Sequence, residues 1–87
     1  MEVVVTLQSD SFNRDFLLPA NVKLKELYPR LLKALKNASS TRFADWKGVI
    51  LKTDEGFLDD VEATLSGYGI CTGNYLDLVE EDWSNGI

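Results

Sequence analysis

The strongest structural signal in this 87-residue chain is the segment Leu24-Lys25-Glu26-Leu27-Tyr28-Pro29-Arg30-Leu31-Leu32-Lys33-Ala34-Leu35. Its leucines and tyrosine recur at intervals of three and four residues, which places them in one stripe of an amphipathic helix. We expect a helix over residues 22 to 37 with Asn21 as its N-cap, because an asparagine side chain can accept from the first free N–H groups. Proline inside a helix costs about 3 kcal/mol, so Pro29 either kinks this helix or begins its main part.

Short segments of alternating apolar residues flank the helix on both sides, as is typical of half-buried strands. The first two are joined by polar turn residues between Ser9 and Asn13, which predicts an antiparallel hairpin. A second turn signal, Asp54-Glu55-Gly56, separates a strand from a very short one, and the glycine-rich segment 64 to 70 suits a tight turn or one 3₁₀ turn. The predicted strands are residues 3–8, 14–18, 48–52, 57–58 and 75–79.

A single helix must bury its apolar stripe, and the only surface available is one face of the sheet. The first and last strands are strongly apolar, which favours central, adjacent positions, and a helical crossover makes such a pair parallel. The sequence therefore predicts an α+β domain of the β-grasp type, with a mixed sheet of four to five strands and one amphipathic helix across one face. Residues 1–80 would form this domain, and residues 81–87 a flexible tail in which Trp83 either covers the domain or inserts into a partner.

Composition limits the classes of partner. The net charge of −5 argues against nucleic acid, because phosphate binding needs clustered lysine and arginine. All 9 basic residues precede Thr53, and residues 53 to 87 carry 9 acidic ones. This polarity can orient a charged protein partner, and the alternative is that the charges only form solvated faces. A single cysteine favours a reducing, cytoplasmic location. No apolar run approaches the ~20 residues of a membrane span, so we expect no direct membrane insertion.

Residues suited to catalysis or metal binding are scarce. Histidine is absent, and Cys71 has no second cysteine or histidine to activate it. The acidic run Asp59-Asp60 with Glu62 lacks the spacing of a calcium loop, and no glycine-rich phosphate loop is present. We predict a protein that is not an enzyme and that has no cofactor, no metal and no small-molecule substrate.

Two motifs near the C-terminus resemble known families. Ubiquitin has a Leu-Ser-x-Tyr-x-Ile turn that leads into a Leu-x-Leu strand. This chain resembles it in the turn segment Thr64-Leu65-Ser66-Gly67-Tyr68-Gly69-Ile70 and in the strand segment Tyr75-Leu76-Asp77-Leu78-Val79. The whole resemblance covers roughly residues 3 to 80. Ubiquitin-type conjugation requires a basic tail ending in Gly-Gly, whereas this chain ends Glu80-Glu81-Asp82-Trp83-Ser84-Asn85-Gly86-Ile87. A ubiquitin-like protein modifier is therefore an alternative that would need processing, and a ubiquitin-like scaffold domain in an unrelated assembly is another.

The segment Ile70-Cys71-Thr72-Gly73-Asn74-Tyr75-Leu76 resembles the Gly-Ile-x-x-Gly-Asp-x-Leu turn of the YukD/EsaB proteins, with Asn74 in place of the usual aspartate. The resemblance implies a stand-alone, ubiquitin-fold accessory or regulatory component of Gram-positive type VII (WXG100/ESX) secretion systems. It also implies a cytoplasmic protein that reaches the membrane through its partners, the membrane-embedded secretion components.

Strand alternation predicts a protein-binding surface on the sheet face away from the helix, because period two places every second side chain there. The partner-binding residues expected on this face are Val4, Leu17, Ile50, Tyr75 and Val79. The alternative is that they are ordinary strand-forming residues among polar neighbours. A secondary candidate is the basic helix face, which is otherwise a solvated surface: Lys23, Arg30, Lys33 and Lys36.

Overall fold

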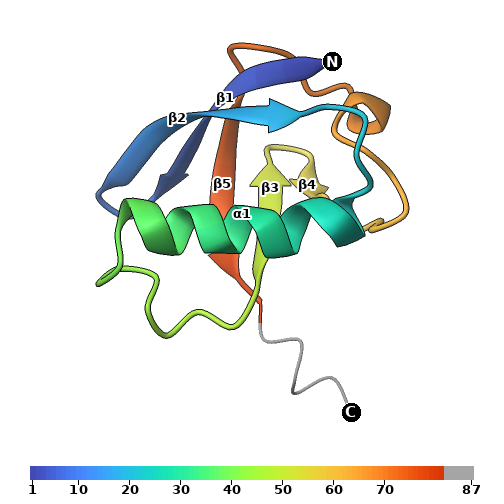
Figure 1. The fold of residues 1–87 in the computed structure, drawn as a ribbon. Helices are drawn as coiled ribbons and strands as arrows, with labels where there is room; N and C mark the ends of the chain where they lie inside the picture. The colour runs from blue at the N-terminus through green and yellow to red at the C-terminus, as the bar shows by residue number, and fades with distance from the viewer. Residues whose placement is uncertain (82–87) are drawn as a thin grey trace.

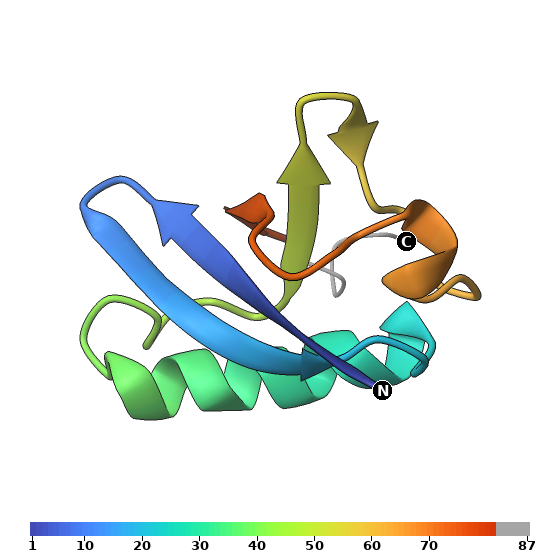
Figure 2. The same cartoon turned by 90° about the horizontal axis from the view of Figure 1, so that it is seen from above.

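The computed structural model describes residues 1–81, so Trp83 and the predicted tail, apart from Glu81, lie outside the described residues. The elements in chain order are β1 (Glu2–Ser9), β2 (Phe12–Pro19), α1 (Leu24–Ala38), β3 (Val49–Thr53), β4 (Gly56–Phe57), the 3₁₀ helix η1 (Ser66–Tyr68) and β5 (Tyr75–Glu80). The strands form one sheet in the order β2-β1-β5-β3-β4, and α1 runs across one side of it (Figures 1 and 2). The ubiquitin-like β-grasp fold, of the α+β class, is confirmed.

The first and last strands lie side by side at the centre of the sheet, as predicted (Figure 1). They run parallel, with Thr6 paired to Tyr75 and Gln8 paired to Asp77. The other pairings, β1 with β2, β3 with β5 and β3 with β4, are antiparallel. The long connection through α1 supplies the crossover that a parallel pair needs.

The β1–β2 hairpin is longer than the sequence predicted, and its turn is shorter. The strands pair from Glu2–Pro19 to Ser9–Phe12, which leaves only Asp10 and Ser11 as the loop. Asp10 takes a φ of +48°, and aspartate tolerates this left-handed region better than most residues. Phe12, predicted as a turn residue, is buried in the core instead.

The helix begins at Leu24, two residues later than expected, and Asn21 is not its N-cap. Lys23 takes that position without a side-chain cap. The peptide N–H groups of Leu24 and Lys25 instead donate to the backbone carbonyls of Ala63 and Val61, at 2.8 and 2.9 Å. Because the segment between β4 and β5 already satisfies these orphan donors, no polar side chain is needed there.

Pro29 lies inside one continuous helix, so it does not begin a separate main part. Its ring is on the exposed side of α1. The proline removes one N–H donor from the helix, and the carbonyl that this donor would have met lies one turn earlier, at the exposed residue Lys25, within reach of water.

The core lies between α1 and the facing side of the sheet. The helix contributes Leu24, Leu27, Tyr28, Leu31 and Leu35, all buried. At the far end of the sheet the loop after α1 adds Phe43, whose ring meets Phe12 and Trp46 edge-on at centroid distances of 5.0 and 4.9 Å. Within residues 1–81, no helix has the length and apolar character needed to cross a bilayer.

Candidate functional site

The helix covers one side of the sheet and leaves the other side, which we call the open face, free of it (Figure 2). Three of the predicted partner-binding residues are exposed on the open face. Val4 on β1 pairs directly with Leu17 on β2, and these side chains are 39% and 60% exposed. Tyr75 on β5 pairs with Thr6, one step further along β1, and is 62% exposed. Diagonal neighbours on a sheet remain within reach of an aromatic side chain, so these residues form one exposed apolar group: Val4, Leu17 and Tyr75.

The prediction that Ile50 is exposed on this face is wrong. Ile50 is only 5% exposed and belongs to the hydrophobic core, and Val79 is partly buried and packs against that core. The two residues are direct antiparallel partners on β3 and β5. Strand alternation gives the face on which a residue lies and not how far its neighbours cover it, so it did not decide which residues of β3 meet solvent.

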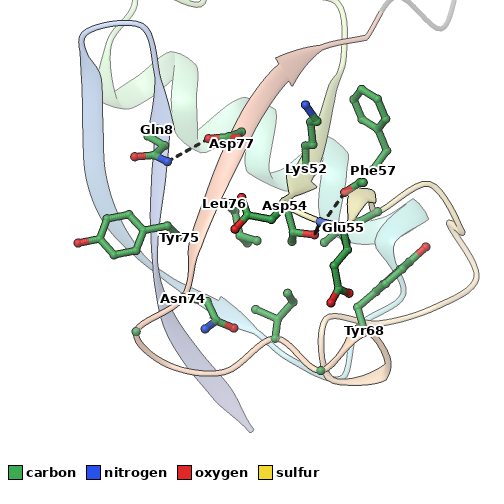
Figure 3. Close-up of a pocket in the computed structure, with 16 residues that line it drawn as sticks. Gln8, Lys52, Asp54, Glu55, Phe57, Tyr68, Asn74, Tyr75, Leu76 and Asp77 are labelled. Atoms are coloured by element: carbon green, nitrogen blue, oxygen red, sulfur yellow. Dashed lines mark hydrogen bonds between the residues drawn. The ribbon is translucent and has the colours of Figure 1, made fainter.

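Hydrogen-bonded polar side chains separate the exposed apolar group from Ile50 and Val79. The Gln8 side-chain amide donates to a carboxylate oxygen of Asp77 at 3.0 Å, across the central β1–β5 pair (Figure 3). Next to it, the Thr6 hydroxyl donates to Asp15 at 2.6 Å. The predicted patch is therefore divided, and only its Val4–Leu17–Tyr75 part presents apolar surface to a partner.

Phe57 is an exposed aromatic residue on the open face that the sequence reasoning missed. It is 47% exposed and pairs with Lys52, whose ammonium group lies 5.7 Å from the centre of its ring. A sequence signal was available, because the Asp54-Glu55 turn sets Phe57 opposite Lys52, and Lys52 shares its face with Ile50. Phe57 was missed because the short strand was expected at residues 57–58, one residue later than β4.

A hollow of about 650 Å³, which we call the notch, opens on this face between the β3–β4 hairpin, the η1 region and the start of β5 (Figure 3). Aromatic rings and charged side chains both line it. The lining residues that matter below are Lys52, Asp54, Glu55, Tyr68, Tyr75 and Asp77. No sequence pattern indicated the notch, because it depends on where β3 and β5 stop pairing.

The basic helix face, the secondary candidate, lies on the opposite layer of the domain. Lys23 and Lys25 both bind the Glu62 carboxylate, at 3.1 and 2.9 Å. The hydrogen bond from Lys25, followed by that from Lys23, lowers the pKa of Glu62, and the same contact raises the pKa of Lys25. Lys23 is thus occupied within the domain. Arg30 and Lys33 are exposed, and Lys36 is partly exposed.

The described residues offer binding surfaces more than reactive groups. Among residues 1–81, no group of three histidine, cysteine, aspartate or glutamate side chains is placed to hold a metal ion. Cys71 is exposed in the turn before β5, where its peptide N–H donates to the Asn74 side chain at 2.8 Å. Burial raises the pKa of Tyr28 to about 12, but this hydroxyl lies in the core between α1 and β3, away from both candidate faces.

Comparison with solved structures places the fold among ubiquitin-like domains. The ubiquitin-like domain of the Mycobacterium tuberculosis type VII secretion system protein ECCD1 superposes with a TM-score of 0.76 at 18% identity, covering 92% of this chain and 99% of that domain. The EccD5 ubiquitin-like domain from Mycobacterium xenopi superposes with a TM-score of 0.76 at 17% identity, covering 94% of this chain and 97% of that domain. The ubiquitin-like domain of Plasmodium falciparum Dsk2 superposes with a TM-score of 0.64 at 17% identity, covering 93% of this chain and 100% of that domain. No family model and no curated protein sequence matches the chain.

Proposed function

We propose that this chain is a non-catalytic protein-binding module of a Gram-positive type VII secretion system, an accessory or regulatory component of the YukD/EsaB kind. It works in the cytoplasm and docks through its open face on membrane-embedded components of that system. Two observations support this proposal. One is the turn motif Ile70 to Leu76, which resembles the YukD/EsaB turn. The other is the fold similarity to the ubiquitin-like domain of the secretion protein ECCD1.

The observation that carries the docking surface is the exposed apolar group. Leu17 and Tyr75 are each more than half exposed, on rigid paired strands of the sheet. Because strand pairing already orders the backbone here, a partner that covers these side chains does not have to order the main chain, which suits a reversible interface. The helix side presents mainly charged residues instead, whose contacts with a partner would be weakened by salt.

The test is affinity capture from detergent-solubilised membranes of a Gram-positive bacterium that carries a type VII system, using the intact chain as bait. We expect secretion-system components in the eluate of the wild type and their loss with Leu17→Asp or Tyr75→Ala. The matched control is Lys33→Ala, an exposed change on the helix side that leaves the open face intact. Melting temperatures of all baits establish that they are folded.

Each outcome bears on a separate part of the proposal. Capture that is lost with Lys33→Ala and kept with Leu17→Asp would move the docking site to the helix face and overturn the role of the open face. Recovery of no secretion-system component by the folded wild type would contradict the role in secretion.

A further inference from the structure

The notch marks the place where the pairing between β3 and β5 ends. The last paired residues are Lys52 on β3 and Asp77 on β5, whereas β5 itself begins at Tyr75. Beyond Lys52 the chain turns into the β3–β4 hairpin, so the first residues of β5 face open space on that side. Figure 3 shows Tyr75 and Asn74 along one side of this space and the hairpin residues along the other.

The direction of the peptide groups at this point follows from a hydrogen bond to β1. The Asn74 carbonyl accepts from the N–H of Thr6 at 2.9 Å, so it faces β1. Successive peptide groups in an extended strand point to opposite sides, and the N–H and C=O of Tyr75 must therefore face the notch. The β3–β5 pairing ends at Lys52 and Asp77 and so does not include Tyr75, and within residues 1–81 neither of these two groups bonds to a turn or loop residue or to a side chain. A free donor and acceptor on a strand is a template on which another extended chain can pair.

The charges around the notch select the kind of chain that fits. Asp54 and Glu55 are exposed at the tip of the β3–β4 hairpin, and Asp77 lies across from them. Among the described residues that line the notch, the one cation is Lys52, which lies over the Phe57 ring at the opposite end of the notch from Tyr68 (Figure 3). Three carboxylates against one ammonium give a negative potential, which favours a positively charged ligand.

We propose that the notch binds an extended, positively charged segment of the partner protein. The main chain of that segment pairs with Tyr75, and an arginine or lysine side chain reaches the carboxylates of Asp54 and Glu55. The inference rests on the proposed function for the existence of a partner, and it specifies the chemistry by which that partner is held. Arginine suits the site better than lysine, because its planar guanidinium can bind a carboxylate in a bidentate manner.

The experiment is an NMR titration of the ¹⁵N-labelled chain with two peptides whose capped termini carry no charge. They are acetyl-Val-Arg-Val-Arg-Val-amide and its matched counterpart acetyl-Val-Glu-Val-Glu-Val-amide. We expect the arginine peptide to shift the Tyr75 amide and the amides of residues 52 to 56 in a saturable way, and the glutamate peptide to shift none of them. The double variant Asp54→Lys/Glu55→Lys should weaken binding of the arginine peptide by about tenfold, as expected for two partly solvated charge pairs.

A matched double variant controls for net charge. Asp45→Lys/Glu80→Lys changes the charge by the same amount at two exposed positions that do not line the notch, and it should leave the affinity close to that of the wild type. Shifts spread over all acidic surfaces, equal binding of the two peptides, or equal weakening by both double variants would overturn the proposal.

Failure of this inference can be told apart from failure of the proposed function. Absence of arginine-peptide binding, together with loss of partner capture by Leu17→Asp, would overturn the role of the notch alone. Capture that Leu17→Asp does not weaken would contradict docking through the exposed apolar group, whatever the peptides do.

Discussion

The hydroxyl of Tyr28 accepts a hydrogen bond from the peptide N–H of Leu51 at 3.3 Å and thereby joins the helix to β3. The same hydroxyl donates to the carbonyl of Leu58 at 2.6 Å, and the N–H of Leu58 donates to the carbonyl of Leu51 at 2.8 Å. The hydroxyl therefore stands where the second bond of an antiparallel pair would be. One buried side chain thus fills the core and completes the pairing of β3 beyond the end of β4.

Tyr28→Phe should lower the free energy of unfolding by about 1–3 kcal/mol, because it leaves the N–H of Leu51 and the C=O of Leu58 buried without a partner. Urea denaturation followed by circular dichroism measures the change. Tyr75→Phe is the matched control, since its hydroxyl is on an exposed ring, and it should have almost no effect. Equal stability of Tyr28→Phe and the wild type would show that the inserted hydroxyl does not contribute.

The stability of the protein should fall in strong base through Tyr28. Burial raises the pKa of this hydroxyl from 10.0 to about 12, so the folded state holds the proton more tightly than the unfolded state. The resulting stabilisation is complete below pH 10 and is lost as the pH rises towards 12. Melting temperatures between pH 9 and 12 test this, because the gap between the wild type and Tyr28→Phe should narrow over that window. A gap that stays constant would mean that the buried hydroxyl does not titrate there.

Leu31→Ala should destabilise the domain by about 2–5 kcal/mol, the usual cost of removing a buried leucine side chain from a packed core. Leu31 lies in the middle of the buried stripe of α1. Such a loss is a large share of the stability of a domain of this size. Lys33→Ala, two residues away on the exposed side, should stay within about 0.5 kcal/mol of the wild type. Similar unfolding midpoints for the two variants would contradict the position of the stripe.

Leu17→Asp and Ile50→Asp should behave differently, although the sequence placed both residues on one face. Leu17 is exposed, so its aspartate variant should keep a melting temperature close to that of the wild type. Ile50 is buried in the core, and a carboxylate there would lose its hydration without gaining a partner. Thermal unfolding should show a large loss of stability for Ile50→Asp or no folded protein at all. A stable Ile50→Asp variant would restore the original prediction of one continuous patch.

Glu62→Gln should change how the stability of the domain depends on pH in the acidic range. Its contacts with Lys25 and Lys23 lower the pKa of the Glu62 carboxyl below the ordinary 4.5. The stabilisation is therefore present above pH 4.5 and is lost as the pH falls through the lowered value of the folded state. The melting temperature of the wild type should approach that of Glu62→Gln as the pH drops through this range. The difference should also shrink in high salt, because all three side chains are exposed.

The arrangement of helix and sheet could be predicted because two signals in the sequence are long and regular. The leucine stripe from Leu24 to Leu35 fixes one helix with one buried side, and the apolar first and last strands fix the centre of the sheet. The helix start could not be predicted in the same way. Its first N–H groups are bonded by carbonyls of Val61 and Ala63, residues distant in sequence, so the local capping signal at Asn21 was misleading.

The candidate site was predicted in part, because alternation along a strand tells which side of the sheet a residue faces but not what covers it. Val4, Leu17 and Tyr75 face the open side and are exposed, whereas Ile50 faces the same side and is buried beside Val79. The notch follows from the residue at which β3 leaves β5, a tertiary detail that no local pattern encodes. The role of these residues in binding a partner stays a prediction.

The central pairing of β1 with β5 has a consequence for the newborn chain. Thr6 on β1 pairs with Tyr75 on β5, which is synthesised much later. While the polypeptide emerges from the ribosome, the hairpin and the helix can form, but one edge of β1 has no strand to pair with. That edge presents unpaired N–H and C=O groups on a strand with several apolar side chains, and it can pair with other chains until β5 has been translated. The nascent domain should therefore stay in need of a chaperone's protection until almost all of it has been synthesised, and then close in one late step.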